Sequence, residues 1–259
     1  MVFSWFRDQH RRTISSQEFP DEWNDYLTNN VKHVARLTAD ELQELHHDTQ
    51  IFIAEKHWEG LGGLEITAEM QVTIAAQACI LVLHREHDYF PNVESILVYP
   101  TGYTAKETSV EPGGILHETL SERLGEAWGN GPIILSWADV LAGGRNDQDG
   151  RNVVFHEIAH KLDMRDGAAD GVPRLDDERA FDHWETVMKQ EYQQLVDQSE
   201  HGKASLLDTY GATNPAEFFA VATECFFEKA HQMQQTHASL YAVLSEFYQQ
   251  DPASSTNIP

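Results

Sequence analysis

The chain has 259 residues, of which 41% are hydrophobic and 10% aromatic, and its formal net charge is -24. This much apolar material supports one substantial folded core, which excludes a disordered acidic tail. The negative charge repels a phosphate backbone and an anionic membrane surface alike, which argues against direct binding to nucleic acid or to a membrane. We expect a single domain over residues 1–250 and a flexible C-terminal tail over residues 251–259.

The first half of the chain predicts helices followed by short strands. Between Pro20 and Trp58 the apolar residues recur at helical spacing, which predicts two or three helices, with Thr38 capping the second. A segment from Thr67 to Arg85 is apolar on nearly all sides at its centre, so it is predicted to be a buried helix.

Two runs rich in β-forming residues, Ser95–Tyr99 and Pro132–Trp137, predict strands of a small sheet. The segment 116–127 between them could be a third strand or a loop with a hairpin. Gly143 and Gly144 then break the chain. The second half predicts four further helices, at about 152–164, at about 177–198, from Asn214 onward, and at about 239–250. The predicted fold class is α+β: a mainly helical single domain with a small sheet.

The two cysteines, Cys79 and Cys225, stand in apolar surroundings and are predicted to be buried free thiols. The N-terminus lacks the apolar run of a signal peptide, and no apolar stretch is long enough for a membrane helix. The expected compartment is the cytoplasm.

The strongest chemical signal is the stretch from His156 through Glu157 to His160. Residues four apart on a helix lie one turn above the other, so the two imidazoles can hold one zinc ion. Glu157 can take a proton from a zinc-bound water, whose pKa falls toward about 7, and deliver it to a leaving amine. Three fixed residues make a short motif, but the apolar residues around them are typical of a buried helix. The pattern predicts peptide hydrolysis.

A third zinc ligand is needed, because a catalytic zinc site normally takes three protein ligands and a water. Glu217 and Glu224 lie seven residues apart, so they share one face of a predicted helix. We favour Glu217 as the ligand, with Glu224 as its substitute or as a group that orients a ligand. Alternatively, Glu217 only helps Asn214 to cap the helix and Glu224 is solvated. Asp166 is a weaker candidate ligand.

Three more residues are candidates for supporting roles. Asn152 and Asp163 fall on the histidine face of the motif helix, where they could orient the imidazoles; equally, Asn152 could be a helix cap and Asp163 a solvated residue at the helix exit. The metzincin pattern would require glycine at 163 and histidine at 166, so that subclass is disfavoured. Tyr210, at the end of a loop, could stabilise the oxyanion of a tetrahedral intermediate.

Several segments together resemble the Mlc titration factor A family over most of the chain. They are 152–163, 208–211, 214–220 and 247–252, with further similarity at 20–23 and 96–139. The resemblance implies a zincin-like zinc metallopeptidase of the gluzincin type, with a catalytic core similar to that of anthrax lethal factor and with aminopeptidase activity.

Carried over to this sequence, the resemblance makes His156, His160 and Glu217 the zinc ligands, Glu157 the general base and Tyr210 the transition-state stabiliser. It also implies binding to the transcriptional repressor Mlc, beside a peptide substrate. The competing hypothesis is a regulatory protein that sequesters a transcription regulator with little peptidase activity. The enzyme is favoured, because a structural zinc site would take four protein ligands and leave Glu157 without a role.

Overall fold

The computed structural model describes residues 2–254 except 102, 111–115, 124, 128–130 and 176–177. The side chains of 2–6, 103–127, 166 and 178 are also outside the description. Helices dominate the described part, and the strands form one small sheet and one hairpin, which confirms the predicted mainly helical α+β class.

The N-terminal part is helical, as the spacing of its apolar residues predicts. Thr38 begins a helix with a capping box: its hydroxyl accepts from the backbone N–H of Glu41, and the Glu41 carboxylate accepts from the backbone N–H of Thr38. The helix predicted to run to Arg85 is buried along its length but ends at Ile80. The elements are α1 (Val2–Ser15), α2 (Asp21–Asn30), the short 3₁₀ helix η1 (Lys32–Arg36), α3 (Ala39–Glu55) and α4 (Ala68–Ile80).

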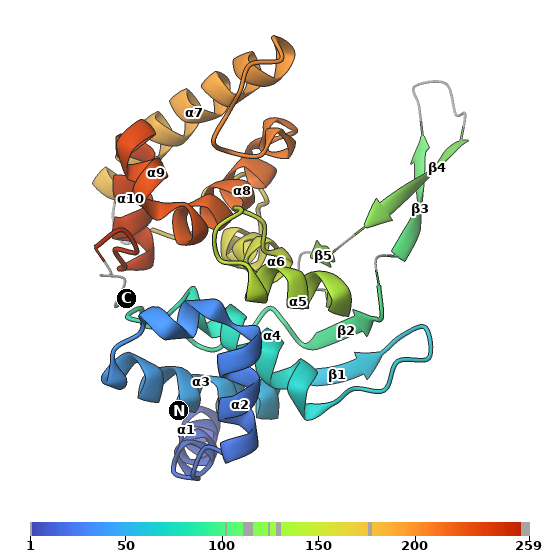
Figure 1. Ribbon diagram of the computed structural model, residues 1–259, viewed down its shortest axis with the longest axis vertical. Coiled ribbons are helices and arrows are strands. Elements are labelled where there is room, and N and C mark those ends of the chain that lie inside the picture. The colour runs from blue at the N-terminus through green and yellow to red at the C-terminus, as the bar shows by residue number, and fades with distance from the viewer. Residues whose placement is uncertain are drawn as a thin grey trace.

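The sheet has the order β1-β2-β6-β5. Strands β1 (His57–Gly60), β2 (Ser95–Tyr99) and β6 (Ile133–Ser136) are parallel, and β5 (Gly125–Ala127) runs antiparallel to β6. Strands β3 (Tyr103–Val110) and β4 (Leu116–Arg123) form a separate antiparallel hairpin that projects from the body (Figure 1). The segment 116–127 thus holds both a hairpin arm and an edge strand.

The predicted chain break at Gly143 and Gly144 is wrong, because both glycines lie inside α5 (Trp137–Arg145). A Cβ at Gly144 would come 2.3 Å from the backbone oxygen of Asn30, and one at Gly143 would come 3.0 Å from Cα of Asn152. The glycines let α5 lie close to α2 and to the start of the next helix, so close packing explains them rather than a turn.

A central helix, α6 (Val153–Asp163), lies between the N-terminal helices and the C-terminal ones (Figure 1). Buried residues from the sheet, α4, α6, α8 and α10 form one continuous core. The remaining elements are the 3₁₀ helices η2 (Met164–Asp166) and η3 (Thr209–Ala212), and helices α7 (Glu178–Glu200), α8 (Pro215–Glu228), α9 (Ala230–Thr236) and α10 (Ala238–Tyr248).

Cys79 and Cys225 are buried and free, as predicted. At the C-terminal end, the hydroxyl of Tyr241 donates to Asp251 and accepts from the backbone N–H of Ala253. The chain therefore contacts α10 as far as residue 253, and residues 255–259 of the expected tail lie outside the described part. No described helix combines the length and the apolar character needed to cross a membrane.

Candidate metal centre

Helix α6 is a rigid base for the motif because its start is capped and its rear face is buried. The side-chain oxygen of Asn152 accepts from the backbone N–H groups of Val154 and Phe155, both at 3.1 Å. The cap interpretation of Asn152 therefore describes its contacts. Phe155 and Ile158 are buried in the core, which leaves the histidine face directed at α8.

Helix α8 brings the remote carboxylates to this face. It begins at Asn214, whose side chain accepts from the backbone N–H of Glu217 at 3.0 Å, and Pro215 occupies its first turn. Glu217 and Glu224 both contact the imidazole of His156, so the face that they were predicted to share is the one against α6.

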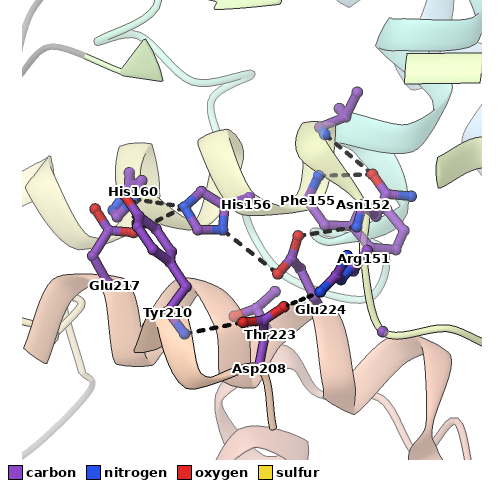
Figure 2. Close-up of polar contacts among 12 residues, drawn as sticks. Arg151, Asn152, Phe155, His156, His160, Asp208, Tyr210, Glu217, Thr223 and Glu224 are labelled. Carbon is purple, nitrogen blue, oxygen red and sulfur yellow. Dashed lines mark hydrogen bonds and ion pairs between the residues drawn. The ribbon is translucent and has the colours of Figure 1, made fainter. Parts of the chain in front are cut away.

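Three ligand-type atoms converge between the two helices (Figure 2). Nε2 of His156 lies 3.0 Å from Oε2 of Glu217 and 3.2 Å from Nε2 of His160, and the third side of this triangle measures 3.4 Å. Ligands about 2.05 Å from a tetrahedral zinc ion lie about 3.3 Å from one another. The triangle therefore has the size that such an ion requires, and two imidazoles with a carboxylate are a donor set that zinc takes in peptidases. The residues fit the metal.

The charges in the triangle are coupled. Burial opposes protonation of His156, but hydrogen bonds to Glu217 and Glu224 raise its pKa well above the ordinary value. Burial likewise opposes ionisation of Glu217, yet its hydrogen bonds to His156 and His160 lower its pKa to about 2. The two carboxylates therefore favour a positive charge beside His156, and a bound cation would supply such a charge.

Glu224 contacts the other nitrogen of the His156 ring, Nδ1, and not the one that belongs to the triangle. One of its oxygens accepts from the backbone N–H of Asn152 at 2.9 Å, and the other lies 3.5 Å from Nδ1 of His156. This arrangement lets Glu224 fix the direction of the His156 ring, and it does not place Glu224 among the three converging atoms. One turn further on, Glu228 accepts from the backbone N–H groups of Gly150 and Arg151 at 2.8 and 2.9 Å.

Glu157 is 3% exposed and lies between the two histidines in the chain. Lys161, one turn after it, is fully buried and donates from Nζ to the backbone oxygen of Gly131 at 2.8 Å. Burial lowers the pKa of Lys161 to about 8, while the nearby charge of Glu157 acts in the opposite direction. Sequence reasoning missed Lys161, although a lysine four residues after Glu157 on a buried helix was a signal that could have found it.

Asp163 is fully buried, and its carboxylate accepts from the backbone N–H of Gly171 at 3.0 Å. The interpretation of Asp163 as a solvated exit residue is therefore wrong, because its carboxylate holds the loop that follows α6. The side chain of the weaker candidate Asp166 lies outside the described residues.

Tyr210 lies on the other side of the triangle, on η3. Its ring is centred 6.1 Å from the ring of His156 and extends toward the two histidines (Figure 2). Tyr210 is 55% exposed, so it borders the open side of the centre. Its neighbour Asp208 accepts from the backbone N–H of Tyr210 at 3.0 Å and from the guanidinium of Arg151 at 2.7 Å. Sequence reasoning gave no role to Asp208 or Arg151.

A helix with two histidines and an adjacent glutamate, facing a carboxylate on a second helix beside a small sheet, defines the class of metallopeptidases. The chain belongs to the family described as glucose-regulated metallo-peptidase M90, whose sequence model matches residues 5–249. This membership places the chain in the broad class of metallopeptidase-type hydrolases.

Relatives agree with the family. The chain is 37% identical over 246 residues to an uncharacterized protein of Synechocystis sp., a match that covers 95% of this chain and 90% of the relative. It is 31% identical over 239 residues to Mlc titration factor A of Salmonella agona, covering 91% of this chain and 88% of that protein. The match to Mlc titration factor A of Salmonella arizonae is 31% identical over 234 residues, covering 89% and 91%. The resemblance seen in the sequence is confirmed.

Proposed function

We propose that the protein is a zinc-dependent peptidase in which His156, His160 and Glu217 hold the ion and Glu157 is the general base. The observation that carries the proposal is the triangle of two nitrogens and one oxygen with sides of 3.0, 3.2 and 3.4 Å. Zinc bound there supplies an acidified water and polarises the scissile carbonyl.

Glu157 performs the proton transfer in this proposal. Its carboxylate accepts the proton of the attacking water and passes it to the nitrogen of the leaving amine. Its position on α6 between the two histidines supports the role, because the same helix fixes base and ligands relative to each other. Burial at 3% exposure keeps bulk water from competing for the carboxylate.

Tyr210 stabilises the developing oxyanion. Its hydroxyl donates a hydrogen bond to the oxygen that gains charge as the carbonyl is attacked. The ring distance of 6.1 Å to His156 and its place on the open side support this role, because a substrate has to enter between Tyr210 and the ligands. We extend the proposal to aminopeptidase activity and to a cytoplasmic location, the first from the family resemblance and the second from the free cysteines.

The test compares wild type with Glu157→Gln, which keeps the size of the side chain and removes its basicity. Hydrolysis of aminoacyl chromogenic substrates should fall by about 10²- to 10⁴-fold. Metal analysis should still find zinc, since Glu157 is not a ligand. The same substrates with an acetylated amino group should resist wild type if the enzyme is an aminopeptidase. A variant with full activity would show that Glu157 is not the base.

A second candidate function is regulatory binding, and the observation in its favour is that relatives at 31% identity are named Mlc titration factor A. In this alternative, the protein sequesters a transcription regulator such as Mlc and has little peptidase activity. Glu157→Gln separates the two functions: a variant that loses hydrolysis but retains a regulator on an affinity column shows that binding does not need catalysis.

A further inference from the structure

The carboxylate of Asp208 joins two parts of the chain at the open side of the centre. One oxygen accepts from the backbone N–H of Tyr210 at 3.0 Å, which caps the start of η3. The other accepts from the guanidinium of Arg151 at 2.7 Å, across 57 positions in the sequence. Figure 2 shows Asp208 between Tyr210 and Arg151, with a dashed line to each.

Helices α7 and α8 pack against η3. A Cβ at Gly211 would lie 3.1 Å from Leu195 on α7 and 3.2 Å from Val221 on α8, so the 3₁₀ turn rests directly on both helices. The hydroxyl of Thr213 donates to the backbone oxygen of Tyr210 at 2.6 Å. The backbone of η3 is therefore held by packing against α7 and α8, and the cap from Asp208 fixes the backbone N–H of Tyr210, next to the Cα that carries its side chain.

The other end of this connection is equally fixed. Arg151 immediately precedes Asn152, which caps α6. The backbone N–H of Arg151 donates to Glu228 at 2.9 Å and to Asp149 at 3.0 Å. The bond between Arg151 and Asp208 therefore ties the segment that leads into α6 to the segment that leads into η3.

We propose that Asp208, with help from Arg151, is a positioning residue that sets the Tyr210 hydroxyl over the metal ligands. The inference rests on the proposed function of Tyr210. Asp208 acts mainly through its cap of η3. The side chain of Arg151 is 75% exposed, and exposed ion pairs contribute little, so the guanidinium makes the smaller contribution.

A double-mutant cycle with Tyr210→Phe tests the proposal. Asp208→Ala should lower kcat about 10-fold with KM and zinc affinity unchanged, because a misplaced donor affects the transition state alone. In the Tyr210→Phe background, Asp208→Ala should cause no further loss, since the hydroxyl that it positions is gone. Asp208→Asn keeps an oxygen for the cap but loses the charge, so it should match Arg151→Met, with a loss of at most about 3-fold.

A second measurement uses the protein without metal. With 3-fluorotyrosine at position 210, wild type should give a ¹⁹F resonance distinct from that of free fluorotyrosine, and Asp208→Ala should move it toward the free value. Thr38→Ala removes a cap of α3, away from the centre, and should leave both the resonance and kcat unchanged. This variant controls for a general loss of stability.

The outcomes separate the positioning role of Asp208 from the catalytic role of Tyr210. Equal losses from Asp208→Ala in the wild-type and Tyr210→Phe backgrounds, or an unmoved resonance, overturn the positioning role and leave the catalytic role of Tyr210 intact. Full activity of Tyr210→Phe overturns the catalytic role and the inference with it. Loss of zinc from Asp208→Ala also overturns the inference, because the residue would then act on the ligands.

Discussion

The two sides of the candidate metal centre are held in different ways. On the side of α6 and α8, Asn152 and Glu224 are 1% and 7% exposed, and each bonds to backbone N–H groups. On the side of η3, Tyr210 is 55% exposed, and the Arg151 side chain that pairs with Asp208 is 75% exposed. The difference indicates that the proposed ligands are held by the buried interior, whereas the proposed oxyanion donor Tyr210 is held at a position that solvent and a substrate can reach.

The buried side forms a continuous chain of hydrogen bonds. The amide of Gln77 accepts from the side chain of Asn152 at 2.9 Å, the backbone N–H of Asn152 donates to Glu224, and Glu224 faces Nδ1 of His156. Leaving one of these groups without a partner in the interior costs about 1–3 kcal/mol. The chain therefore resists distortion, and substitutions in it should change metal affinity before they change the catalytic step.

The largest effect that separates the two sides is expected for Glu224→Ala. Loss of the carboxylate behind His156 frees the imidazole to rotate, so zinc affinity should fall by about 10- to 100-fold. Glu224→Gln keeps an acceptor for the backbone N–H of Asn152 and should lose less. Titration with zinc against a competing chelator measures both variants. If Glu224→Ala lowers the melting temperature but binds zinc as tightly as wild type, Glu224 supports the fold and does not orient the ligand.

The parts of the fold that the sequence predicted are those where local signals agree. Thr38 and Asn214 both cap helices, because a short polar side chain precedes a helical run of apolar residues. Strand β1 escaped prediction, since its four residues have no fully buried side chain and depend on pairing with β2. The glycines of α5 were misread, because the close approach that they permit depends on residues distant in the sequence.

In the candidate site, too, some residues were predictable from local patterns and others depend on tertiary packing. The helical spacing of His156 and His160 fixes their common direction, so the pair was predictable from local geometry. The spacing could not decide between Glu217 and Glu224, since both share the face toward α6, and only the packing of α8 sets one at the triangle and one behind His156. The pairing of Asp208 with Arg151 had no local signal, because the two residues are 57 positions apart.

Glu228 should make the stability of the buried side depend on pH. Burial raises the pKa of Glu228 from 4.5 to about 8. Because the folded protein holds this proton where the unfolded chain releases it, stability falls as pH rises from about 4.5 to about 8. Glu228→Gln cannot titrate, so relative to wild type it should gain stability across that window, up to about 5 kcal/mol for the full shift. Denaturant unfolding at several pH values measures the difference, with the exposed Glu246→Gln as the control. Parallel curves for wild type and Glu228→Gln would contradict the prediction.

The smallest effects should come from one methyl group added on each side. Gly211→Ala brings a Cβ within 3.1–3.4 Å of α7 and α8, against which η3 packs. Gly143→Ala brings a Cβ 3.0 Å from Cα of Asn152, the cap of α6. Each should cost about 1 kcal/mol of unfolding free energy, because a packed neighbour has to shift. Gly211→Ala displaces Tyr210, so it should lower kcat a few-fold at unchanged zinc affinity. Gly143→Ala disturbs the cap instead and should weaken zinc binding at unchanged kcat of the zinc-saturated enzyme. If both variants changed kcat, or both changed zinc affinity, the two sides of the centre would not be independent and the contrast between them would be wrong.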